Sequence, residues 1–191
     1  MLLCIRTWKG NNDVQDSFVG FLFSNKLVIL RNEDLTRIWE YRSQEGSIFR
    51  FFAPDEASNR KMIAIGCSNK KVLLVDFDSK ALVDEFKIPK TITSLIFRGQ
   101  VLISENSGNV FTYSLETKNL NCILGHLSIV TDICLDSERK LVFSADKDQK
   151  IRVSRFPCAF VIENFLLAHE SFVSKIALSP NGEFLVSGGG D

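Results

Sequence analysis

The sequence predicts an all-β fold built from repeats of roughly 40 residues. Two observations carry this prediction. Short apolar runs rich in Val, Ile and Phe recur along the 191 residues, separated by turn sequences such as Asn106-Ser107-Gly108. Polar residues also recur at a fixed spacing in the second half of the chain. The expected strands include Lys26–Leu30, Met62–Ile65, Val72–Val75, Thr93–Phe97, Val101–Ser104, Val110–Tyr113, Val130–Leu135, Leu141–Phe143, Ile151–Val153, Phe160–Leu167, Val173–Leu178 and Phe184–Val186.

The repeat is clearest for three polar residue types. The two histidines are 43 residues apart, and two aspartates that follow them have the same spacing. A serine precedes each aspartate by four residues. This period fits a four-stranded WD-repeat propeller blade, in which such residues form a buried hydrogen-bond network. We therefore expect one network of His126, Ser144 and Asp148 and a second of His169, Ser187 and Asp191.

Weaker copies of the repeat precede these networks. Residues 65–76 have the order of the Ser-Gly-Ser-x-Asp-x-x-Val-x-Leu-Trp-Asp block of WD repeats, with Asn69 at the turn aspartate. Trp39-Glu40 is a candidate for an earlier Trp-Asp pair. We predict a WD-repeat β-propeller with blades over residues 46–90, 91–126 and 127–168, preceded by a degenerate blade or N-terminal strands over 1–45. The first half of a further blade occupies 169–191, so the propeller is expected to be incomplete, with about four blades plus half of a fifth, and the chain to be a fragment.

Composition excludes several classes of protein. Lys plus Arg and Asp plus Glu each number 23, so the chain carries no overall basic field for nucleic acid. The five cysteines are scattered and form no Cys-x-x-Cys pair, which predicts free thiols in an intracellular compartment without a zinc site. No stretch approaches the ~18 apolar residues of a membrane span.

The residues give little support to catalysis. Both histidines fall on repeat positions, which favours a structural role over a metal or catalytic one. Asp146 and Asp148 lie two residues apart in a tight turn, so we expect them to be structural rather than paired catalytic carboxylates. No Gly-x-Ser-x-Gly motif or phosphate-binding glycine loop occurs.

The most specific sequence lies in the second half of the chain. It comprises Gly125-His126-Leu127-Ser128, the segment from Ser144 to Ser154, and His169-Glu170-Ser171-Phe172. After Lys-Ile-Arg, Val-Ser stands where most WD repeats have Val-Trp. This sequence resembles that of the WD-repeat, non-catalytic subunit of the tRNA (guanine-N7-)-methyltransferase. The resemblance is strong over residues 101–191 and weaker over 45–100.

The resemblance implies a scaffold rather than an enzyme. The chain would bind and order a separate methyltransferase subunit in a heterodimer that forms N7-methylguanosine in tRNA, in the nucleus. S-adenosylmethionine would be held by that partner, and this chain would need no cofactor. Partner contacts would fall on Lys147, Gln149, Lys150 and Arg152. The family usually has an acidic residue at Gln149 and a lysine at Asn106, so contacts at these two positions are in doubt.

The periodicity of the expected strand also predicts on which face Arg152 lies. Ile151 and Val153 share one face of their expected strand, and Arg152 points to the other. Arg152 is therefore expected to be exposed among other cations, either as a docking residue or as part of an ordinary solvated strand surface. The alternative function is a generic WD-repeat adaptor that assembles another protein complex. A propeller with enzymatic activity is the third possibility.

Overall fold

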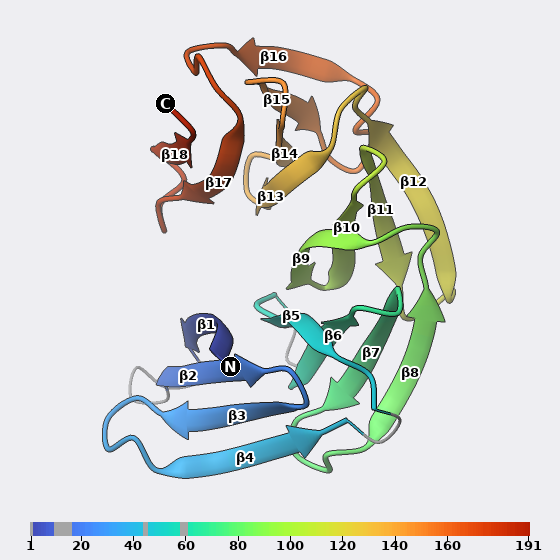
Figure 1. Ribbon diagram of the computed structural model, residues 1–191, viewed down its shortest axis with the longest axis vertical. Helices are drawn as coiled ribbons and strands as arrows, with labels where there is room; N and C mark the ends of the chain where they lie inside the picture. Colours follow the sequence, from blue (N-terminus) through green and yellow to red (C-terminus); the bar gives the residue numbers. More distant parts are fainter. Residues whose placement is uncertain (1, 10–16, 44–45, 58–60) are drawn as a thin grey trace. The chain divides into compact units, whose positions relative to one another are not determined.

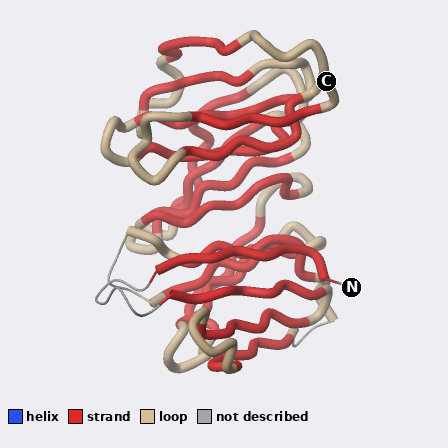
Figure 2. Tube along the Cα trace, turned by 90° about the vertical axis from the view of Figure 1, so that its left-hand side faces the viewer, coloured by secondary structure: helices blue, strands red, loops and turns tan. Residues whose placement is uncertain are grey.

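The computed structural model describes residues 2–9, 17–43, 46–57 and 61–191, with side chains at residue 2 and from residue 17 onward (Figure 1). Its regular elements are antiparallel β-strands joined by turns and loops (Figure 2). The predicted all-β fold is confirmed. Within the described ranges, no helix is long and apolar enough to cross a membrane.

Strands that are consecutive in the chain are neighbours in each sheet, which is the strand order of a propeller blade. The first sheet contains β1 (Leu2–Lys9), β2 (Ser17–Phe23), β3 (Lys26–Arg31) and β4 (Arg37–Arg42). The second contains β5 (Phe49–Pro54), β6 (Met62–Cys67), β7 (Lys71–Asp76) and β8 (Leu82–Lys87).

The later sheets repeat this order. The third contains β9 (Ile92–Arg98), β10 (Gln100–Glu105), β11 (Asn109–Ser114) and β12 (Asn119–Gly125). The fourth contains β13 (Val130–Asp136), β14 (Leu141–Asp146), β15 (Ile151–Arg155) and β16 (Ile162–Leu166). A two-stranded sheet follows, formed by β17 (Val173–Leu178) and β18 (Leu185–Gly189).

Burial differs systematically between the strands of a sheet. Every residue of β6 is buried, as are all but the first residue of β10, because both faces of these second strands are covered. The fourth strands β8, β12 and β16 are mostly exposed. The second strands therefore read as continuous apolar runs, whereas the fourth strands carry many polar residues.

The chain divides into two compact units, residues 1–91 with 95–101 and residues 92–94 with 102–191. The first unit has an aromatic core in which Trp39 stacks on Tyr41 and on Phe77, with ring centroids 5.8 Å apart in both pairs. Trp39 lies on β4, the fourth strand, whereas Asp76 ends β7, a third strand. Trp39-Glu40 therefore does not occupy the Trp-Asp position of a blade, and the interpretation of this pair as a repeat marker is wrong.

The second unit has a smaller apolar cluster and a buried polar tie between strands. Ala145, Ile151, Val173 and Ile176 form the buried cluster. The Asp132 carboxylate on β13 accepts a hydrogen bond from Ser94 Oγ at 2.6 Å and another from the backbone N–H of Ile176 at 3.2 Å. Because Ser94 lies on β9 and Ile176 on β17, this one carboxylate joins strands of three successive sheets.

Candidate protein-binding site

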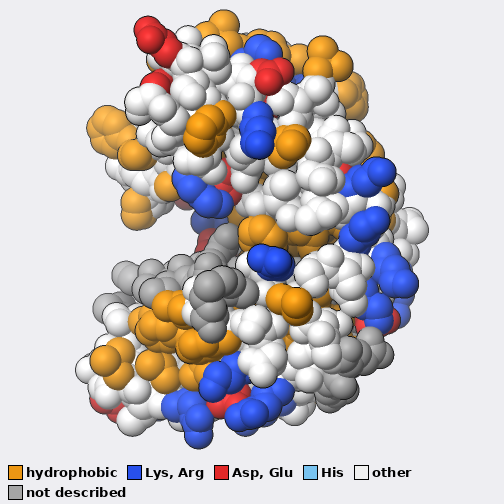
Figure 3. All heavy atoms as spheres, viewed as in Figure 1, with side chains coloured by type: hydrophobic (Ala, Val, Ile, Leu, Met, Phe, Trp, Pro, Cys, Tyr) orange, Lys and Arg blue, Asp and Glu red, His pale blue; other side chains and the backbone are white. Residues whose placement is uncertain are grey.

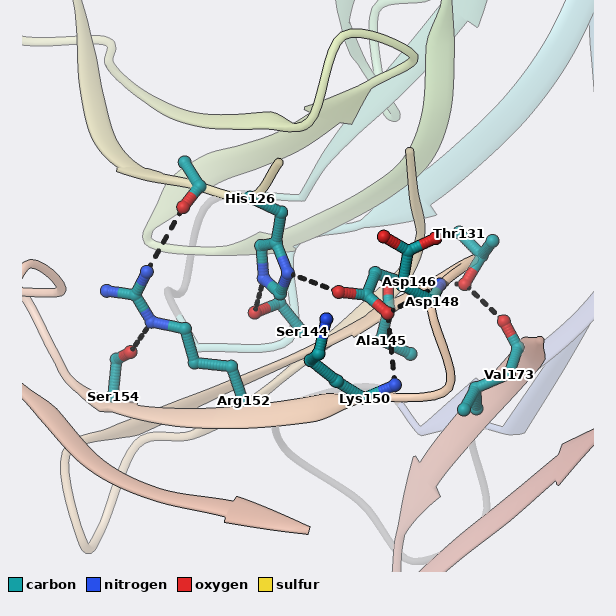
Figure 4. A network of polar contacts seen from close by, with 11 residues as sticks. His126, Thr131, Ser144, Ala145, Asp146, Asp148, Lys150, Arg152, Ser154 and Val173 are labelled. Atoms are coloured by element: carbon teal, nitrogen blue, oxygen red, sulfur yellow. Dashed lines mark hydrogen bonds and ion pairs between the residues drawn. The ribbon is translucent and has the colours of Figure 1, made fainter. Parts of the chain in front are cut away.

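The candidate site is built around the turn between β14 and β15, and a buried histidine contacts the strand end that leads into this turn (Figure 4). His126 follows β12, and its Nδ1 lies 2.9 Å from Asp146 Oδ2. Its Nε2 lies 2.7 Å from Ser144 Oγ. The side chains of His126 and Asp146 are each only 3% exposed. The His126 ring therefore connects the loop between β12 and β13 to the end of β14, and this contact is buried.

The aspartate of this network is Asp146, and the expectation that Asp148 would supply the carboxylate is wrong. Asp146 Oδ1 also accepts the backbone N–H groups of Asp148 and Lys150, at 2.9 and 3.0 Å. One buried carboxylate thus holds the histidine and closes the turn beyond it. Asp148 is exposed at the turn and contributes only its backbone to this network.

The second network uses a different position. His169 Nδ1 lies 2.8 Å from Asp191 Oδ1, and its Nε2 lies 2.8 Å from Ser187 Oγ. Two residues after Ser187, where Asp146 would stand, this repeat has Gly189, which has no carboxylate. A Cβ at Gly189 would lie 2.1 Å from Phe172 O, so this backbone also leaves no room for a side chain. The carboxylate therefore comes from Asp191 in this repeat and from Asp146 in the preceding one.

The partners of His126 fix its tautomer. A carboxylate only accepts, so Nδ1 carries the proton that is donated to Asp146, and neutral Nε2 accepts the Ser144 hydroxyl. Burial lowers the pKa of His126 below its ordinary value, and the hydrogen bond and charge of Asp146 oppose this only in part. The ring is therefore neutral at physiological pH. With its lone pairs engaged by three donors, Asp146 is poorly placed to act as a general base.

Arg152 is buried, and the expectation of an exposed cation is wrong. Its side chain does point away from the Ile151 and Val153 face, but the residue is only 8% exposed because that face is covered as well. The guanidinium donates three hydrogen bonds within the chain. They run to Ser154 Oγ at 2.8 Å, to Ala159 O at 2.7 Å and to Gly125 O at 3.2 Å.

These contacts explain the unusual Val-Ser of this repeat. Ser154 stands where most WD repeats have a tryptophan, and it is fully buried. The Arg152 guanidinium donates to its hydroxyl and reaches the carbonyl that precedes His126. It also holds the loop before β16 through Ala159. Arg152 is thus a structural residue that joins β15 to the end of β12 and to the loop before β16.

The remaining predicted partner contacts lie on the turn itself. Lys147, Gln149 and Lys150 are all exposed. Gln149 adopts a left-handed backbone conformation with φ of 70°, and its amide donates to Glu170 O at 2.9 Å. Among the described contacts of Lys147 and Lys150, only backbone atoms have partners within the chain. The two ammonium groups and the exposed Asp148 carboxylate therefore form the charged surface of the turn.

Outside the turn, the described surface offers no comparable constellation. No group of three or more His, Cys, Asp or Glu side chains among the described residues could hold a metal ion. Cys67, Cys122, Cys134 and Cys158 form no disulfide among the described residues. On the face drawn in Figure 3, Lys and Arg side chains lie in several separate groups between hydrophobic and uncharged ones.

Sequence reasoning missed Asp146 as the partner of His126 because the 43-residue register pointed to Asp148. The available signal was Glu105, which occupies the same place in the preceding repeat. Glu105 is fully buried, and its carboxylate accepts the backbone N–H groups of Ser107 and Asn109 at 2.8 and 3.3 Å. An acidic residue at the end of a second strand therefore caps the following turn in both sheets.

Comparison with known proteins identifies close relatives of this region. The family model described as tRNA methyltransferase TRM82 WD40 domain matches residues 105–191. The tRNA (guanine-N(7)-)-methyltransferase non-catalytic subunit wdr4 of Dictyostelium discoideum is 30% identical over 92% of this chain and 43% of its own length. The subunit WDR4 of Bos taurus is 37% identical over 54% of this chain and 27% of its own length. The chain thus spans less than half the length of these curated relatives.

A solved structure supports the fold. A chain in a crystal structure of the mitotic checkpoint complex superimposes with a TM-score of 0.77, over 97% of this chain and 61% of that chain. The identity is 15%, so this likeness concerns the fold alone. Together with the matched WD40 family model and the strand order of the sheets, it confirms the predicted WD-repeat β-propeller fold class.

Proposed function

We propose that this chain belongs to the WD-repeat family of tRNA (guanine-N(7)-)-methyltransferase non-catalytic subunits, which its family-model match and its relatives support. In this proposal it is a scaffold that binds and orders the catalytic subunit of such an enzyme. The observation that carries the proposal is the extent of the family match. It covers residues 105–191, and this range contains the turn after β14 with its histidine network and its exposed lysines.

In this proposal the chemistry belongs to the partner. The catalytic subunit binds S-adenosylmethionine and transfers its methyl group to N7 of a guanosine in tRNA, and this chain reaches tRNA through the complex. The polar network of this chain supports a non-catalytic role. His126 and Asp146 are buried and satisfied by each other, by Ser144 and by the turn backbone, so they have no free group to offer a substrate.

The turn between β14 and β15 is the proposed contact region. Lys147 and Lys150 are exposed and lie on either side of a backbone that the Asp146 carboxylate holds closed. A rigid turn presents charges at low entropic cost on binding. We place carboxylates of the catalytic subunit opposite these two lysines. Arg152 acts behind the surface, through the segments that it joins, and the proposed site of action is the nucleus.

The test is reconstitution with the catalytic methyltransferase subunit. The two chains should co-purify at equal stoichiometry, and labelled S-adenosylmethionine should be retained by the catalytic subunit and not by this chain alone. Methyl transfer to unmodified tRNA should require the catalytic subunit and increase when this chain is added. If the chains do not associate, the proposal fails and a generic WD-repeat adaptor becomes the better explanation. Methyl transfer by this chain alone would contradict the non-catalytic assignment.

A further inference from the structure

One apolar side chain next to the proposed contact region is fully exposed. Leu127, directly after His126, has a relative exposure of 107%, the highest among the described large hydrophobic residues. Single exposed leucines are common on protein surfaces and carry no meaning by themselves. The surroundings of Leu127 distinguish it from such a case.

The backbone that presents Leu127 is fixed between two turns. The N–H of His126 donates to Gly108 O at 2.9 Å, in the turn between β10 and β11. On the other side, the N–H of Lys147 donates to Ile129 O at 3.0 Å, in the turn between β14 and β15. A Cβ on Gly108 would come within 2.5 Å of His126 O, so the loop is in close contact with the first turn. The side chain is therefore presented by an anchored loop.

The blade itself does not require a leucine at this position. In the next repeat, the residue after His169 is Glu170, which is also exposed. In the preceding repeat, the N–H of Ile88 donates to Lys70 O as that of His126 does to Gly108 O, and the following residue is Pro89. Three repeats thus place a leucine, a glutamate and a proline in the same loop position. The choice of leucine has no explanation in the packing of the sheets.

The charges beside Leu127 indicate the chemistry of what covers it. Asp146 is buried and engaged with His126 and with backbone N–H groups, so it does not compensate the exposed lysines of the turn. The exposed charged side chains of the turn are Lys147, Asp148 and Lys150, and together they carry one net positive charge. A complementary surface would have an apolar recess for one leucine, bordered by carboxylates.

Resting on the proposed function, we propose that Leu127 is the apolar anchor by which this chain docks on the catalytic methyltransferase subunit, with Lys147 and Lys150 at the rim of the contact. The leucine is desolvated at the centre of the contact, and the lysines at its edge remain partly hydrated. Burial of one exposed leucine should strengthen association by roughly tenfold or more. The lysines contribute more to the association rate and its salt dependence.

The experiment measures the Kd of the catalytic subunit for the whole chain and for single variants by isothermal titration calorimetry. Leu127→Asp should weaken binding by at least about tenfold, because a charge would enter the apolar recess. Leu127→Met should bind nearly as well as the wild type, because it keeps an apolar side chain of similar volume. Leu35→Asp is the matched control, since Leu35 is 60% exposed between β3 and β4 and belongs to the other compact unit.

Melting curves of all variants accompany the titrations, and Leu127→Asp should melt as the wild type does because its side chain has no buried contacts. Wild-type affinity of Leu127→Asp would overturn the inference while leaving the proposed function intact. An equal loss of affinity in Leu35→Asp would overturn it too. Failure of the wild-type chain to bind would overturn both. A wild-type dimer that Leu127→Asp dissociates, with unchanged binding of the catalytic subunit, would assign the leucine to self-association and overturn the inference.

Discussion

Replacement of Arg152 by methionine tests the structural role of the buried guanidinium. Methionine keeps an unbranched apolar stem and removes every donor, so the change isolates the hydrogen bonds. The loss leaves Ser154 Oγ and Ala159 O without their donor inside the protein, and Gly125 O without a donor nearer to the surface. The variant should therefore fold with a lower free energy of unfolding.

The size of the effect follows from the two fully buried bonds. A buried polar group that loses its partner costs roughly 1–3 kcal/mol, so two such groups give a loss of about 3 kcal/mol. For a chain of this length, that corresponds to a decrease of roughly 6–12 °C in Tm. The weaker contact to Gly125 O adds little, because its carbonyl can be hydrated.

Urea unfolding and thermal melting, both followed by circular dichroism, measure the loss. Lys150→Met is the matched control, because the Lys150 side chain is exposed next to the same strand. It should change the free energy of unfolding by less than about 0.5 kcal/mol. If Arg152→Met and Lys150→Met melt at the same temperature as the wild type, the guanidinium does not stabilise the blade and the argument from burial is refuted.

Three further predictions follow from the same unit. Because the pKa of His126 is lower in the folded chain than in the unfolded one, the unfolded state binds more protons as the pH falls. The contribution of His126 to the free energy of unfolding should be complete above about pH 6.5 and should decrease as the pH is lowered through that value. His126→Gln should flatten this dependence of Tm on pH. Asp146→Ala should lower the free energy of unfolding by about 2–3 kcal/mol and Asp148→Ala by less than about 0.5, in urea titrations; the reverse order would restore Asp148 as the network residue. Gly108→Ala should lower the free energy of unfolding by about 2 kcal/mol or more, because its Cβ would meet a backbone oxygen at 2.5 Å. Gly99 also has a positive φ but nothing within 4 Å, so Gly99→Ala should cost only the backbone strain of about 1 kcal/mol. Equal melting temperatures of the two variants would contradict this prediction.

Several of the strands that periodicity predicted have covered faces. Met62–Ile65 and Val101–Ser104 fall within β6 and β10, whose second-strand positions are buried on both sides. The fourth strands β8 and β12 were absent from the predicted set, because their residues are mostly exposed and alternate with charged or amide side chains. An outer strand leaves an apolar pattern only where it carries exposed hydrophobic residues, as in the predicted run Phe160–Leu167, which contains the mostly exposed β16.

For the predicted site residues, the structure decides which side chains are exposed, and it differs from the prediction at Arg152. The turn after β14 does present Lys147 and Lys150 to solvent. Arg152 was expected beside them because strand alternation separates it from Ile151, and that separation is correct. The alternation of side chains along a strand shows on which face a side chain lies. It does not show whether another segment covers that face. The covering groups are the Gly125 carbonyl at the end of β12 and the Ala159 carbonyl in the loop between β15 and β16.

The sequence by itself determined the all-β class and the repeat of a blade, because these depend on short apolar runs and on residues at fixed spacing. Tertiary structure alone decided which carboxylate reaches His126 and where Arg152 lies. Asp146 and Asp148 have the same chemistry two positions apart, and only the path of the turn places one of them inside. The burial of Arg152 likewise depends on carbonyls that folding brings from 27 and 7 residues away. Interactions of this kind have no local pattern, because their energy depends on distances between segments that only the folded chain fixes.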